Sequence, residues 1–155
     1  MLQISRRTDY AVRIMIELGL YPEGESMPSR QVARKTGVPK AFLHKITADL
    51  VKANLVRTFA GPAGGLALAL PANEITLLQI IEGVEGPICL NVCLIRPHEC
   101  PRDQICSAHS LWGRIQTLVV QELQSVSLQQ LVVEARDMRQ HPVQFRDGIP
   151  YLTTG

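Results

Sequence analysis

The feature that most restricts the fold of this chain is one tight break between two short helical patterns. Gly37 and Pro39 interrupt apolar residues that otherwise recur at helical spacing. Glycine adopts the left-handed conformation that ends many helices, and proline is tolerated as the first residue of the next one. We therefore predict a helix over residues 30–35, capped by Ser29, and a second helix over residues 40–54.

Further elements flank this helix-turn-helix pattern. A helix is predicted over residues 8–20, and two strands, 55–59 and 66–70, surround the glycine-rich turn 61–65. The alternative is a plain helical hairpin in a bundle. The order of helix, helix-turn-helix and hairpin instead favours a winged helix-turn-helix that binds DNA. The predicted fold class is mainly α with a small β wing.

The charge is divided unevenly along the chain. Residues 1–70 hold ten Lys/Arg and five Asp/Glu, whereas residues 71–155 hold six and nine, and all four lysines lie in the first part. Such an asymmetry indicates that the first part meets a polyanion, although chance variation of a surface could also produce it.

The second half contains a long amphipathic helix. A short helix is predicted over 76–84, and apolar residues then recur from Leu111 to Val126 in a helix over 108–126. Its apolar stripe needs a partner, and a second copy of the chain is the simplest one, with some packing on the winged domain as well. A further short helix is predicted over 128–135.

These patterns predict four regions. Residues 1–72 form the winged helix-turn-helix domain, 73–107 a connecting helix and cysteine loop, 108–135 the dimerisation helix region, and 136–155 a mobile tail. No apolar run approaches the roughly 18 to 20 residues that cross a bilayer, and no secretory signal is visible. We therefore expect a cytoplasmic protein without a membrane partner.

All four cysteines lie close together. They are Cys89, Cys93, Cys100 and Cys106, in a segment with two prolines and no sustained period. In a reducing compartment, clustered thiols indicate metal or redox chemistry rather than structural disulfides. No Ser/His/Asp, paired-carboxylate or phosphate-loop pattern accompanies them, so we expect neither an enzyme nor a small-molecule substrate.

Five segments precede the cysteine triplet along the chain: 4–13 (ISRRTDYAVR), 38–43, 61–65, 74–78 and 82–87. Together with the triplet, and over about residues 1–133, they resemble the Rrf-type transcription regulators, the family with IscR-like and NsrR-like members. The resemblance implies a homodimer of winged domains with a cluster-binding loop before the dimerisation helix. The wing departs from the family pattern, because Ala60, Ala63 and Leu66 replace its arginine, one glycine and its tyrosine.

The resemblance also implies the ligands of an iron-sulfur cluster. Cys93, Cys100 and Cys106 match the family's three thiolates, with gaps of six and five residues. His109 matches the fourth ligand of IscR-like members on a 2Fe-2S cluster. Asp9 matches the ligand that the other subunit supplies to a 4Fe-4S cluster in NsrR-like members, and its Thr-Asp-Tyr context favours this version.

Other roles for these residues stay open. Asp9 also suits the positive end of a helix dipole, and His109 at the start of a helix suits a solvated surface. Cys89 falls outside the triplet and is expected to be a buried thiol. Zinc ranks lower than a cluster, because the spacing lacks a pair of C-x2-C knuckles.

Ten residues are candidates for contacting DNA. Phosphate contacts are expected from Arg6, Arg7, Arg30, Lys45, Lys52 and Arg57, and sequence readout in the major groove from Lys40, Ala41, His44 and Thr47. Lys40, His44, Lys45 and Thr47 are expected to point outward, and Phe42 to lie on the buried side of the same helix. Each basic side chain could also be merely solvated.

The predicted function is a homodimeric transcription regulator in which an iron-sulfur cluster controls affinity for an inverted-repeat operator. The signal would be nitric oxide, redox state or iron supply. Two alternatives remain: a metal-free thiol-switch repressor, and a small iron-sulfur or zinc protein that does not bind DNA. Steep salt dependence of DNA binding would exclude the second of these.

Overall fold

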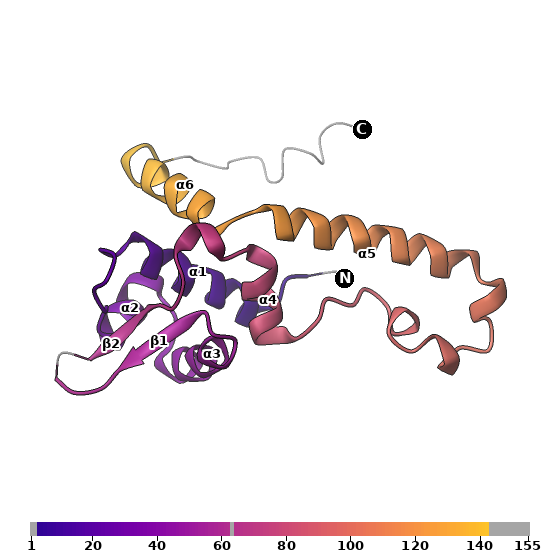
Figure 1. Cartoon of the computed structure of the whole chain (residues 1–155), viewed down its shortest axis with the longest axis horizontal. Helices are drawn as coiled ribbons and strands as arrows, with labels where there is room; N and C mark the ends of the chain where they lie inside the picture. The colour runs from indigo at the N-terminus through magenta and orange to yellow at the C-terminus, as the bar shows by residue number, and fades with distance from the viewer. Residues whose placement is uncertain (1–2, 63, 143–155) are drawn as a thin grey trace.

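The computed structural model describes residues 3–62 and 64–142. It is mainly helical with a two-stranded wing, as the sequence predicts (Figure 1). The elements in chain order are α1 (Arg6–Leu20), α2 (Ser29–Thr36), α3 (Lys40–Lys52), β1 (Val56–Phe59), β2 (Gly65–Leu68), α4 (Leu77–Glu85), α5 (Ser107–Ser125) and α6 (Leu128–Gln140). Short 3-10 turns lie at Ala72–Glu74, Val92–Leu94, Pro97–Glu99 and Asp103–Ile105.

The helix-turn-helix forms around a left-handed glycine. Gly37 has φ 69°, which ends α2, and its amide donates to the Ala33 carbonyl. Pro39 precedes α3. The expected cap by Ser29 is wrong: Ser29 is the first helical residue, and Pro28, which has no side-chain acceptor, precedes it. The first amides of α2 therefore have no side-chain cap.

The wing is an antiparallel hairpin. Val56 pairs with Leu68 and Phe59 with Gly65. Leu66 also forms a bridge to Met27, which anchors the second strand to the segment before α2. A Cβ on Gly65 would lie 2.3 Å from the Met27 carbonyl oxygen, so only glycine allows this close approach.

One core holds together α1 to α4, the wing and α6. Its fully buried side chains include Ile14, Ile46 and Ile80, and Leu128 and Val132 of α6 belong to the same cluster. Helix α6 is therefore part of the winged domain's core and not only of the dimerisation region predicted over 108–135. It also continues to Gln140, past the expected start of the tail at residue 136. The rest of that tail, residues 143–155, lies outside the described residues.

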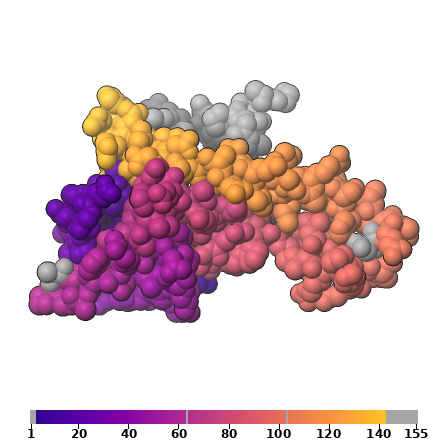
Figure 2. Space-filling view, viewed as in Figure 1, coloured from indigo at the N-terminus to yellow at the C-terminus, as the bar shows by residue number. Residues whose placement is uncertain are grey.

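Helix α5 extends away from this core. Figure 1 shows it running from the winged domain to the cysteine segment at the far end of the molecule. It packs against α4 and the turn at Val92–Leu94, but none of its residues is buried. Figure 2 shows α5 and the cysteine segment as an arm projecting from the winged domain. Among the described residues, no helix has the length and apolarity needed to span a membrane.

Candidate nucleic-acid interface and cysteine segment

Helix α3 presents one polar face to solvent. Lys40, Ala41, His44 and Lys45 are exposed, as the sequence predicts for the second helix of a helix-turn-helix. Their side chains are therefore accessible to a groove of DNA. Thr47 does not share this face: its side chain is buried, with 8% of its surface exposed, so the expected outward position is wrong.

Phe42 also differs from expectation. It is 45% exposed instead of buried, because Leu43, Ile46 and Leu50 already fill the core side of α3. Its ring packs edge-on against Tyr10 of α1, with centroids 5.7 Å apart and planes at 75°. Such an aromatic pair fixes α3 against α1 at the edge of the domain. The sequence gives no sign of this partner, which lies 32 positions earlier.

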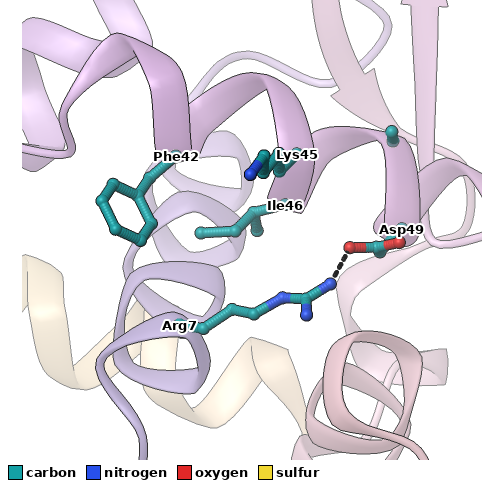
Figure 3. Close-up of a pocket in the computed structure, with 6 residues that line it drawn as sticks. Arg7, Phe42, Lys45, Ile46 and Asp49 are labelled. Atoms are coloured by element: carbon teal, nitrogen blue, oxygen red, sulfur yellow. Dashed lines mark hydrogen bonds and ion pairs between the residues drawn. The ribbon is translucent and has the colours of Figure 1, made fainter.

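Arg7 lies in the first turn of α1, and its side chain extends to α3. Its guanidinium forms an ion pair with Asp49 of α3 (Figure 3). Lys45 lies on the same side of α3, and these side chains line a shallow hollow of about 480 Å³ with Phe42, Ile46 and Ala48. The hollow combines two cations with one carboxylate, so a phosphate placed there would compete with Asp49 for Arg7. Asp49 is not among the residues predicted from the sequence.

The other predicted phosphate contacts are distributed over four elements. Arg6 begins α1, Arg30 lies in α2, Lys52 ends α3 and Arg57 lies in β1, and all four are exposed. The wing itself carries Phe59 at 46% exposure. An apolar side chain near the wing tip could insert between base steps, whereas the substituted wing residues have no charge to offer.

The cysteine segment consists of short 3-10 turns. Cys93 lies in the first of these turns, Cys100 directly follows the second, and Cys106 precedes α5. All three are partly buried. Cys89 is also only partly buried, not fully as expected, and its thiol donates to the Asn91 carbonyl at 3.0 Å.

Thiolates are the right kind of donor for an iron-sulfur cluster. The described part of the chain, however, gathers no group of three or more His, Cys, Asp or Glu side chains in a geometry that could hold a metal ion. The donor types thus fit a cluster, but their arrangement in this single chain does not.

The two candidate fourth ligands lie far apart in the molecule. His109 is in the first turn of α5, and its amide donates to the Cys106 carbonyl at 3.2 Å. Asp9 lies in α1, inside the winged domain, while the cysteine segment lies at the other end of α5 (Figure 1). Asp9 instead forms an ion pair with Arg13, 2.7 Å away. One chain therefore does not bring Asp9 to the cysteines.

Comparisons with known proteins agree on one family. The model of the Rrf2 family, described as an iron-dependent transcriptional regulator, matches residues 4–134. The HTH-type transcriptional regulator IscR of Photorhabdus laumondii is 27% identical over 131 residues, which cover 84% of this chain and 79% of that protein.

Two solved structures are similar as well. CymR, the global cysteine regulator of B. subtilis, is 28% identical with a TM-score of 0.72, and the match covers 86% of this chain and 98% of that one. The oxidized form of Staphylococcus aureus CymR is 25% identical with a TM-score of 0.64, covering 84% and 96%.

Proposed function

Because the chain belongs to the Rrf2 family of transcriptional regulators, we propose that it binds operator DNA as a homodimer and that its cysteine segment controls the affinity. The observation that carries this proposal is the exposed face of α3, which presents Lys40, His44 and Lys45, with Arg7 of α1 lining the same hollow as Lys45. An exposed helix of this kind can enter the major groove, while basic side chains around it contact phosphates. Two such domains in a dimer would read an inverted repeat.

Binding of duplex DNA at several salt concentrations tests this function. Neutralising phosphates releases counterions, so the logarithm of the association constant should fall linearly with the logarithm of salt concentration. Lys45→Gln should reduce the slope by about 0.9 for each phosphate that is no longer neutralised, and therefore by about 1.8 for the two copies in a dimer. Arg114→Gln, an exposed change on α5, is the matched control. A chain that binds no duplex, or an unchanged slope for Lys45→Gln, would contradict the proposal.

For the controlling chemistry, we favour an iron-sulfur cluster held by Cys93, Cys100 and Cys106. Support comes from their soft thiolate chemistry and from the iron dependence in the family's description. When bound, the cluster would supply a centre that reacts with oxidants and nitric oxide. The fourth ligand would be Asp9 of a second copy on a 4Fe-4S cluster or His109 on a 2Fe-2S cluster. We favour Asp9 because of its Thr-Asp-Tyr context. It lies in α1, away from the cysteine segment of its own chain, so a second copy would have to supply it.

Anaerobic purification tests the cluster. Wild-type protein should be coloured and contain iron and sulfide, Cys100→Ala should lose both, and Cys89→Ala should keep them. Asp9→Ala and His109→Ala, compared in the same assay, identify the fourth ligand by which of them lowers the iron content. Colourless wild-type protein without iron would contradict the cluster.

A metal-free thiol switch is the second candidate. It is favoured by the arrangement of the described residues, which gathers no metal site, and by the similarity to a CymR that was solved in an oxidized form. In that case the iron-free protein should change its DNA affinity on oxidation, and Cys93→Ala or Cys106→Ala should abolish the change.

A further inference from the structure

The last residue of α4 forms hydrogen bonds to the first turn of α1. Glu85 Oε1 accepts from Ser5 Oγ at 2.5 Å and from Thr8 Oγ1 at 3.3 Å. Ser5 Oγ also accepts from the Thr8 amide at 3.0 Å, so Ser5 is the N-cap of α1. One carboxylate oxygen thus holds both the cap of α1 and a side chain of its first turn.

The stability of α4 alone does not explain an acidic residue at this position. A carboxylate at the C-terminal end of its own helix is disfavoured by the helix dipole, whereas one near the N-terminus of another helix is favoured. Glu85 is the last residue of α4 and contacts the N-terminus of α1. The Thr8 side chain is buried, and its hydroxyl accepts from Ser5 Oγ and donates to Glu85.

This first turn carries two of the predicted phosphate contacts. Arg6 and Arg7 lie between Ser5 and Thr8, the two residues that Glu85 holds. Arg7 also reaches α3 through its ion pair with Asp49. The position of both arginines relative to α3 therefore depends on how firmly the start of α1 is held.

From this arrangement, and resting on the proposed DNA-binding function, we infer that Glu85 is a positioning residue that holds Arg6 and Arg7 in place for contact with DNA phosphates. Gly86 follows with φ 83° and begins the segment that leads to the cysteines. Glu85 is thus the junction between that segment and the DNA-contacting turn. A change in the segment that moves Glu85 also moves the two arginines.

The sign of the effect separates positioning from simple charge. Removing a surface carboxylate makes a protein more positive, and by electrostatics alone this strengthens its binding to DNA. Removing a positioning residue has the opposite effect and weakens binding. Arg6 and Arg7 are then less ordered in the free protein, and ordering them when DNA binds costs free energy.

The test compares three variants of the full-length, iron-free chain on a mixed-sequence duplex at several salt concentrations. Glu85→Met, which removes the acceptor, should bind about 3- to 10-fold more weakly, with a salt slope reduced by about 0.9 for each phosphate that an arginine no longer neutralises. Glu85→Gln keeps a carbonyl acceptor and should restore wild-type binding. Glu82→Met removes the same charge from the same helix, three residues earlier, and should bind as well as wild type or slightly better.

Amide hydrogen exchange gives a readout that does not depend on DNA. Exchange at Thr8 and Asp9 should be faster in Glu85→Met than in wild type and unchanged in Glu82→Met. If wild type fails to bind DNA, the proposed function is wrong. The inference is then wrong as well, even if hydrogen exchange shows that Glu85 holds the start of α1. If wild type binds and Glu85→Met binds equally well or more tightly, or if exchange is unchanged, the inference alone is overturned.

Discussion

At the scale of single residues, Glu17 joins three helices through charge. It is the one charged residue buried among those described, with 3% of its surface exposed. Its carboxylate forms ion pairs with Lys35 of α2 at 3.2 Å and Arg139 of α6 at 2.5 Å. Burial alone would raise the pKa of Glu17, but the hydrogen bond from Arg139 and the positive charges of Arg139 and Lys35 outweigh it and lower the pKa below its usual value.

A lowered pKa makes Glu17 a source of stability that acid removes. A carboxyl whose pKa is lower in the folded state stabilises the fold above its unfolded pKa, and this contribution is lost as the pH falls through the folded value. Glu17→Gln should therefore lower the free energy of unfolding by about 1–3 kcal/mol at neutral pH. The difference should shrink below pH 4.5, the ordinary value. Urea unfolding across pH measures it, with the exposed Glu25→Gln as control.

Thr47 gives a second prediction at this scale. Among the described residues its buried hydroxyl has no hydrogen-bond partner, and an unsatisfied buried polar group costs about 1–3 kcal/mol. Thr47→Val, with nearly the same shape, should therefore raise the free energy of unfolding by about 1 kcal/mol and leave DNA sequence preference unchanged. Thr58→Val, on the exposed side of β1, is the control. Altered sequence preference in Thr47→Val would restore its predicted role in base readout.

At the scale of elements, α6 completes the winged domain. A Cβ on Gly19 of α1 would lie 2.5 Å from Val132 Cγ2, so glycine lets the two helices approach closely. Leu128 and Val132 are buried against α1, and Arg139 adds its ion pair with Glu17. These contacts join the last described helix to the first one.

Truncation of one α6 side chain tests whether this helix belongs to the core. Leu128→Ala should lower the free energy of unfolding of the whole winged domain by about 2–5 kcal/mol, because it leaves a cavity in a fully buried site. Val133→Ala, on the exposed side of α6, should change it by less than about 0.5 kcal/mol. If Leu128→Ala unfolds α6 alone and leaves the stability of α1 to α4 unchanged, α6 is a separate folding unit.

The order and type of the elements were predictable because periodicity and breakers are local. Gly37, for example, ends α2 as expected. What depends on tertiary contacts was not predictable: α6 packs on α1, Phe42 meets Tyr10, and Thr47 lies at the edge of the apolar side of α3, where helical spacing alone leaves its orientation open. The sequence also could not show that the described residues of one chain leave the cysteines ungathered, because the spacing of ligands does not fix how the loop between them folds.

At the scale of the whole molecule, the family match confirms the class predicted from the sequence. The chain is a transcriptional regulator of the Rrf2 family rather than an enzyme, and its winged fold is similar to that of CymR. The positive excess of residues 1–70 coincides with α1 to α3 and the wing, where most of the exposed basic residues lie. The acidic remainder includes the arm formed by α5 and the cysteine segment.

That arm exposes apolar side chains which a second copy would cover. On α5, Leu111 is 42% exposed, Trp112 37% and Leu118 66%. A row of large apolar side chains along one projecting helix is typical of an interface. Burying it between two copies would place two winged domains in one assembly, as an inverted-repeat operator requires.

A charge placed in this row of apolar side chains distinguishes nonspecific DNA binding by a monomer from inverted-repeat binding by a dimer. Leu118→Glu should halve the mass measured by light scattering, because a carboxylate buried in an apolar interface is strongly disfavoured. Each monomer keeps its own α3, so weak, salt-dependent binding to mixed-sequence duplex should persist, while the added affinity for an inverted repeat is lost. Gln121→Glu adds the same charge to an exposed position of α5 and should remain dimeric. Should Leu118→Glu keep the wild-type mass, α5 is not a dimer interface, because it could not bury this carboxylate against a second copy.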